Sequence, residues 1–169
     1  MTAVPQDGDD RLVQTQLTAA QKILVRGTRY YHFRDRIAYS QARPTQLRLP
    51  RETTRLDCSG LVAACMDFAG VMPNVDWRYT NTWVQIQLGR QVAKPLPADV
   101  VFYGHNGNPT HEALYLGTLA QLRTQITVPA EVAAEMKGRG ACVLSHGSYP
   151  MKILPVDYRG DRIQVRRLR

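Results

Sequence analysis

Residues 57–70 have the sequence DCSGLVAACMDFAG, which has the signals of a helix start, an apolar helical face and a helix end. Asp57 is a good helix-capping residue, and from Leu61 onward apolar residues recur at the i, i+4 and i+7 spacing of one helical face. Gly70 is well placed to end the helix, because glycine readily adopts the left-handed conformation found there. The pattern therefore predicts a helix with Cys58 at its N-terminus.

The segments on either side of this helix differ in character. Upstream, apolar residues at helical spacing predict a helix over about 15–31, and the Arg- and Pro-containing segment 34–56 is expected to be a long ordered loop. Downstream, short runs rich in β-branched and aromatic residues are separated by Gly, Pro and Asn turns, with one short helix expected near 129–137. The predicted strands are 99–103, 111–116, 141–146, 151–154 and 162–165. Helices followed by strands predict an α+β fold, with the Cys-bearing helix packed on an antiparallel sheet of about five strands.

The length of 169 residues, with 44% hydrophobic residues, is that of one domain with a full core. Residues 1–12 are polar and acidic, so we expect a flexible N-terminal lead there and a single domain over 13–169. The N-terminus carries acid where a secretory signal carries base, and no apolar run approaches the roughly 20 residues of a spanning helix. We therefore expect neither a signal peptide nor a membrane segment.

The net charge is +8, and most of the 22 basic residues are arginine. Such a surplus is typical of proteins that meet a polyanion, for which nucleic acid and a bacterial cell wall are both candidates. The three cysteines lack CxxC spacing, which argues against a disulfide framework or structural zinc. His111 and Glu112 begin like a zinc-protease helix, but Tyr115 stands where the second histidine is required, so we expect no metal and no cofactor.

Cys58 is the main candidate for chemistry. A thiol at a helix N-terminus is exposed to unpaired N–H groups, which can lower its pKa and can also stabilise an oxyanion. His111 and His146 lie at the ends of two predicted strands, so both can project toward Cys58 and complete a set of nucleophile, base and orienting group. The alternatives are a buried structural cysteine and two ordinary core or surface histidines.

These residues, taken together, resemble the NlpC family of papain-like cell-wall cysteine peptidases. The resemblance rests on DCSGLV at 57–62, LPADVVFY at 96–103, His111 leading into LYLG at 114–117, and His146. Further likenesses point to the peptidase domains of endolysins from phages of actinobacteria. They are YSQ at 39–41, Tyr79-Thr80 with Thr82, SHGS at 145–148 and LPVDYR at 154–159.

The resemblance implies a papain-like fold and a peptidoglycan hydrolase that cleaves the stem peptide, usually between D-glutamate and a diamino acid. It implies Cys58 as nucleophile, His111 as base and His146 as the residue that orients His111. Tyr39 matches a tyrosine that assists the oxyanion, and Asp57 and Ser59 match positions that help to bind the stem peptide. Asp57 and Ser59 could instead only cap the helix, and Tyr39 could only pack.

The segment 118–140 is longer than the turn usual in this family, so it could cover the cleft, restrict the substrate or mediate self-association. Two rival functions stay open: an amidase that cuts between muramic acid and L-alanine on the same fold, and an Arg-rich nucleic-acid-binding protein in which Cys58 is incidental. The favoured partner is bacterial peptidoglycan, with no nucleic acid or membrane. The protein is expected to be made in a host cytoplasm and to act on the wall after release, or to be carried by a virion.

Overall fold

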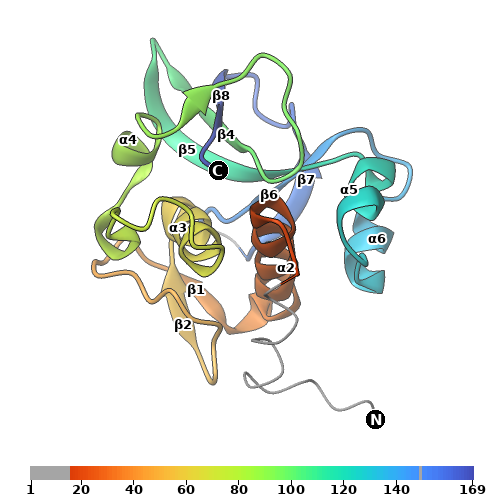
Figure 1. The fold of residues 1–169 in the computed structure, drawn as a ribbon, viewed down its shortest axis with the longest axis horizontal. Helices are drawn as coiled ribbons and strands as arrows, with labels where there is room; N and C mark the ends of the chain where they lie inside the picture. The colour runs from red at the N-terminus through yellow and green to blue at the C-terminus, as the bar shows by residue number, and fades with distance from the viewer. Residues whose placement is uncertain (1–15, 149) are drawn as a thin grey trace.

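The computed structural model describes residues 16–148 and 150–169, in which two long helices pack on one face of a sheet (Figure 1). The N-terminal lead predicted over 1–12 lies outside the described residues. The helices are α2 (Ala19–His32), η1 (Arg34–Arg36), α3 (Cys58–Phe68), η2 (Trp77–Tyr79), α4 (Thr82–Gln85), α5 (Leu119–Gln125) and α6 (Ala130–Met136). The strands are β1 (Ile37–Tyr39), β2 (Thr54–Leu56), β3 (Arg90–Gln91), β4 (Val100–His105), β5 (Asn108–Gly117), β6 (Cys142–Ser145), β7 (Lys152–Pro155) and β8 (Arg162–Arg167).

The main sheet has six strands in the order β3-β8-β4-β5-β6-β7, and every neighbouring pair is antiparallel. This confirms the predicted α+β class and all five predicted strands. The sixth strand, β3, has only two residues, and both are exposed, so it has no alternation of apolar and polar residues for the sequence to reveal.

Helix α3 is the central helix of the fold. The Asp57 side chain accepts a hydrogen bond from the Gly60 N–H and so caps the helix at its predicted start. Every residue from Cys58 to Met66 is buried, because the helix packs against α2, β5 and η2. The helix is therefore covered on all sides rather than on the single apolar face that its spacing suggested.

Helix α2 packs closely against both α3 and the sheet (Figure 1). It starts at a capping box formed by Thr18 and Gln21, a few residues later than predicted. Gly27 lies in its middle, and a Cβ atom there would come within 2.7 Å of Leu114 Cδ2 on β5. The glycine therefore permits a close approach of helix and sheet, which offsets its low helix propensity.

Two segments contain more regular structure than predicted. The expected loop over 34–56 contains η1 and the short parallel pair β1–β2, which forms a small sheet of its own. The insertion over 118–140 contains α6, as predicted, and also α5, whose N-terminal capping box at Thr118 and Gln121 was overlooked.

The sheet separates two apolar clusters. The larger one lies between the sheet and the helices α2 and α3, and the smaller one lies on the opposite face around Val101, Tyr103 and Tyr115. Strand β5 contributes alternate residues to the two faces, so that His111 and Glu112 point in opposite directions. Within the described residues, no helix is long and apolar enough to cross a bilayer.

Candidate active site

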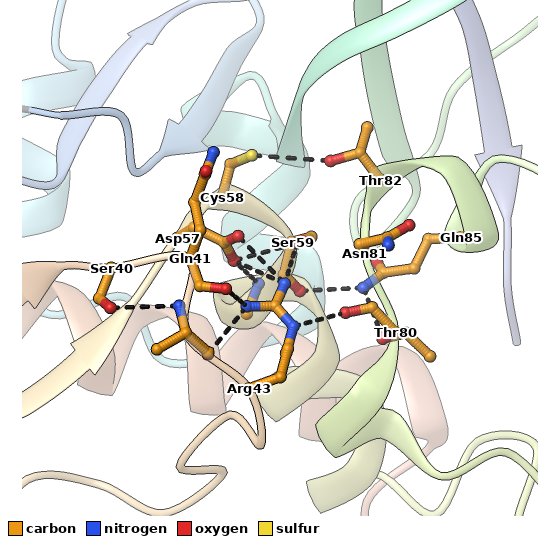
Figure 2. A network of polar contacts seen from close by, with 12 residues as sticks. Ser40, Gln41, Arg43, Asp57, Cys58, Ser59, Thr80, Asn81, Thr82 and Gln85 are labelled. Carbon is orange, nitrogen blue, oxygen red and sulfur yellow. Dashed lines mark hydrogen bonds and ion pairs between the residues drawn. The ribbon is translucent and has the colours of Figure 1, made fainter.

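Cys58 is the first residue of α3, as the sequence predicted, and its side chain is 6% exposed. Its Sγ atom lies 3.8 Å from the Thr82 hydroxyl oxygen at the start of α4 (Figure 2). The backbone N–H of Glu112 on β5 also lies beside the sulfur. The thiol therefore sits where α3, α4 and β5 meet. Cys65 and Cys142 are fully buried, in agreement with their predicted place in the core.

The electrostatic surroundings of Cys58 differ from the prediction of a lowered pKa. Burial, followed by the charges of Glu112 and Asp57, raises the pKa of the Cys58 thiol to about 12. The Glu112 N–H and the Thr82 hydroxyl act in the opposite direction but are outweighed. Desolvation thus affects the pKa of the thiol more strongly than the helix N-terminus does, and the thiol is neutral near pH 7 in the absence of substrate.

His111 lies on the opposite face of β5 from α3, near the end of the strand that also passes the thiol. Its Nε2 atom is 2.8 Å from the Ser145 hydroxyl oxygen, and that hydroxyl is 3.2 Å from the Tyr158 hydroxyl. Burial, reinforced by the positive charge of Arg159, lowers the pKa of His111 to about 4. The imidazole is therefore neutral at pH 7, with Nδ1 as the nitrogen not engaged by Ser145.

No hydrogen bond joins His146 to His111 among the described residues, so its role as the residue that orients His111 stays a prediction. It is 1% exposed, and neither ring nitrogen has a hydrogen-bond partner among the described residues. The centroid of its ring lies 5.9 Å from that of Tyr39, with the two ring planes tilted by 58°. Burial lowers the pKa of His146, although backbone groups of Leu56 and Ala38 favour the protonated ring.

Ser145 holds His111 instead, for a reason of strand geometry. Neighbouring residues at the end of β6 point to opposite faces of the sheet, and Ser145 shares the face of Val143 and His111. The sequence reasoning overlooked this residue, although the alternation from Val143 to Ser145 could have identified it.

Beside His111 the surface is hollowed into a groove of about 340 Å³. Its lining includes Tyr39, His111, Ser145, Ser148, Tyr158 and Arg159. Tyr39 is 38% exposed, and its hydroxyl accepts a hydrogen bond from the Gln41 amide at 3.2 Å. Cys58 is not among the residues that line the groove. Tyr39 is therefore accessible to a substrate, as its predicted role requires.

Asp57 and Ser59 are engaged by Arg43, which the sequence reasoning did not single out (Figure 2). One terminal nitrogen of Arg43 lies 3.0 Å from an Asp57 carboxylate oxygen and 2.8 Å from the Ser59 hydroxyl oxygen. Asp57 also accepts hydrogen bonds from the Ser59 hydroxyl and from the Gly60 N–H. The observed contacts of both residues are thus internal to the fold, and their predicted contact with a stem peptide stays a prediction.

The other nitrogens of Arg43 bind backbone oxygens of neighbouring segments. Its Nε donates to the carbonyl of Thr80 at 2.9 Å, and Nη1 donates to the carbonyls of Gln41 and Ala42. Gln85 adds a second link, because its amide donates to the Ser59 carbonyl and to the Thr80 hydroxyl (Figure 2). These hydrogen bonds connect the start of α3 to residues 41–43, which precede it in the chain, and to residues 80–85, which follow it.

Glu112 is the third residue missing from the sequence-based site, after Ser145 and Arg43. Its side chain is fully buried on the α3 side of the sheet. Neither carboxyl oxygen has a hydrogen-bond partner among residues 16–148 and 150–169. Over the same residues, no group of three or more His, Cys, Asp or Glu side chains is arranged to hold a metal ion.

The chain resembles two solved structures. One is NlpC2 from Trichomonas vaginalis, with 15% identity, a TM-score of 0.49 and coverage of 85% of this chain and 46% of that one. The other is an NLP/P60 family protein similar to a lipoprotein from Staphylococcus aureus, with 18% identity, a TM-score of 0.47 and coverage of 89% and 41%. This chain thus spans less than half the length of either. No curated protein sequence matches it.

A family model gives the decisive comparison. The model of the NlpC/P60 family matches residues 39–138, a range that contains Tyr39, Cys58 and His111. Because this match extends over more than half of the chain, the protein belongs to the NlpC/P60 family.

Proposed function

We propose that this protein cleaves an amide bond in the stem peptide of peptidoglycan, between D-glutamate and diaminopimelate, by acyl transfer to Cys58. Membership of the NlpC/P60 family supports a hydrolase that acts on the cell wall, because members are cysteine peptidases or amidases. The observation that carries the proposal is the position of Cys58 at the start of α3, beside the strand that bears His111. The hydrogen bond between His111 and Ser145 supports a base of fixed orientation.

In the first step, the Cys58 sulfur attacks the amide carbonyl while its proton passes to His111. Burial favours both neutral partners, so the proton moves as the substrate arrives rather than beforehand. Backbone N–H groups at the start of α3 stabilise the oxyanion. His111 then gives its proton to the departing amine, which leaves Cys58 as a thioester.

In the second step, His111 accepts a proton from water, and the hydroxide attacks the thioester. The acid product is released, and the sulfur regains its proton. We assign the orientation of His111 to Ser145 rather than to His146, because Ser145 makes the hydrogen bond to the His111 ring. We assign to His146 the packing of its ring against that of Tyr39.

We also propose that the protein acts as a phage endolysin, made inside a host and acting on the wall after release or carried by a virion. The support is the likeness of the segments at 39–41, 145–148 and 154–159 to endolysin peptidase domains. Purified protein added to outer-membrane-free cells with diaminopimelate walls should lower their turbidity, and the Cys58→Ala variant should not.

The arginines give less support to a nucleic-acid-binding function than their number suggests. Arg167 and Arg169 both pair with the fully buried Asp99, and Arg159 pairs with Asp161. Arg43 is likewise directed into the fold. Many of the positive charges are thus engaged in internal contacts rather than directed toward a polyanion.

The test is mass spectrometry of the fragments released from purified diaminopimelate-type peptidoglycan. The wild-type protein should release fragments that end at D-glutamate, and Cys58→Ala should release none. Fragments cut at L-alanine would keep the mechanism but make the protein an amidase. Fragments released equally by wild type and Cys58→Ala would refute Cys58 as the nucleophile.

A further inference from the structure

Glu112 is a buried acid for which the mechanism so far has no use. It is 0% exposed, and both carboxyl oxygens lack a hydrogen-bond partner among the described residues. A buried carboxyl group without partners is costly, because it loses its hydration without gaining a protein donor. An apolar residue would fill the same position in the sheet at lower cost, so the acid calls for an explanation.

The position of Glu112 relative to the thiol offers an explanation for this buried acid. Its own N–H lies beside the Cys58 sulfur, and its side chain lies on the face of β5 that packs against α3 and α4. The Thr82 hydroxyl is 3.8 Å from that sulfur and is also close to the Glu112 carboxyl group, outside good hydrogen-bond geometry. One hydroxyl thus lies within reach of both the acid and the thiol.

The charges that face Glu112 come from the elements packed against it. Burial, which is the largest cause, and the charge of Asp57 at the start of α3 raise the pKa of Glu112, whereas Thr82 on α4 and Arg43 lower it. The result is a pKa of about 8. His111, its neighbour on β5, is directed to the opposite face of the sheet. At pH 7 Glu112 is therefore mainly the neutral acid.

We propose that Glu112 is a positioning residue for Cys58: as the neutral acid it directs the Thr82 hydroxyl toward the sulfur and so gives the developing thiolate a hydrogen-bond donor. This inference rests on the proposed function of Cys58 as nucleophile. The neutral carboxyl O–H donates to the Thr82 oxygen, and the Thr82 O–H then donates to the sulfur. No proton leaves Glu112 during the reaction.

The ionised carboxylate reverses this arrangement. It accepts the Thr82 hydroxyl proton for its own hydrogen bond and withdraws that donor from the sulfur. It also places a second negative charge next to the forming thiolate, and like charges at such distances disfavour ionisation. The enzyme should consequently lose activity as Glu112 ionises.

The first experiment compares the pH profiles of kcat/KM for wild type, Glu112→Gln and Glu112→Val. Wild-type kcat/KM should fall about tenfold per pH unit above about pH 8, as expected for one required proton. Glu112→Gln keeps a donor and cannot ionise, so its activity should persist to higher pH. Glu112→Val should lack both the alkaline fall and the donor, with a lower rate at pH 7. An identical alkaline fall in wild type and Glu112→Gln would overturn the proposal.

The second experiment does not depend on catalysis. The rate at which iodoacetamide alkylates Cys58 at pH 9 is measured by peptide mass spectrometry, with fully buried Cys65 as the internal control. Without the neighbouring carboxylate, Cys58 in Glu112→Gln should react at least tenfold faster than in wild type. This change corresponds to a thiol pKa that is lower by about one unit. Equal rates would refute the role of Glu112. A faster variant combined with no release of peptidoglycan fragments would instead refute the proposed function alone.

Discussion

The pH dependence of stability gives a direct measure of the burial of Glu112. Because burial raises the pKa of Glu112 from 4.5 to about 8, the folded protein holds a proton that the unfolded chain releases across this pH range. The contribution of Glu112 to stability is therefore fully present below about pH 4.5 and decreases as the pH rises toward 8. At 1.36 kcal/mol per pH unit, the loss reaches about 3 kcal/mol at pH 7 and about 5 kcal/mol at pH 8 and above. Glu112→Gln removes the ionisation and should abolish this slope.

The assay is urea unfolding of wild type and Glu112→Gln at pH values from 4.5 to 9, followed by tryptophan fluorescence. Trp77 is 2% exposed and reports on the packing beside α3. His111 contributes an opposite slope at acidic pH, but it does so in both proteins, so the difference between the two curves isolates Glu112. We expect the variant to gain several kcal/mol relative to wild type between pH 5 and pH 8. Parallel curves over this range would show that Glu112 is not a buried neutral acid in the folded protein.

Three further predictions concern the residues around the thiol. Ser145→Ala should lower kcat about tenfold or more with little effect on KM, because it releases the His111 ring. His146→Ala leaves the hydrogen bond between Ser145 and His111 intact, so it should lower kcat less. Steady-state kinetics on peptidoglycan fragments compares the two variants. Arg43→Ala should destabilise the protein by roughly 3–5 kcal/mol, because the buried Asp57 carboxylate loses its partner, and Arg43→Ala combined with Asp57→Asn should recover part of that loss in urea unfolding. Because the pKa of His111 lies at about 4, its neutral form persists in moderately acidic solution, so kcat/KM should hold down to about pH 5, and a half-maximal point near pH 6.5 would contradict a buried base.

The sequence predicts the parts of this fold that follow from local periodicity. The Asp57 cap places the start of α3 correctly, and alternation places the five longer strands within a few residues. It does not predict β3, which has two exposed residues, or the parallel pair β1–β2 inside the Arg-rich segment. Short strands are formed by pairing with distant residues, and a single sequence does not show that pairing.

The same distinction applies to the site. Cys58 and His111 lie at element ends that local patterns identify, so both could be singled out. Arg43 reaches Asp57, 14 positions further along the sequence, only because the chain folds back between them, and its role depends on that tertiary contact. Ser145 was overlooked for a different reason, since the histidine that follows it has the more reactive side chain but points to the other face of the sheet.

The two faces of β5 explain how one strand can influence the thiol in two ways. His111 faces the groove, where a substrate can approach and where a base must accept a proton, whereas Glu112 faces the buried side, close to the Thr82 hydroxyl that contacts the sulfur. Burial lowers the pKa of His111 to about 4 and raises that of Glu112 to about 8, because it favours the neutral form of each. Between about pH 4 and about pH 8, both side chains are therefore neutral, which is the form that the proposed mechanism requires. The pH range over which the enzyme is active should therefore narrow at its acidic end when His111 is made more exposed. The same range should widen at its alkaline end when Glu112 is replaced by glutamine.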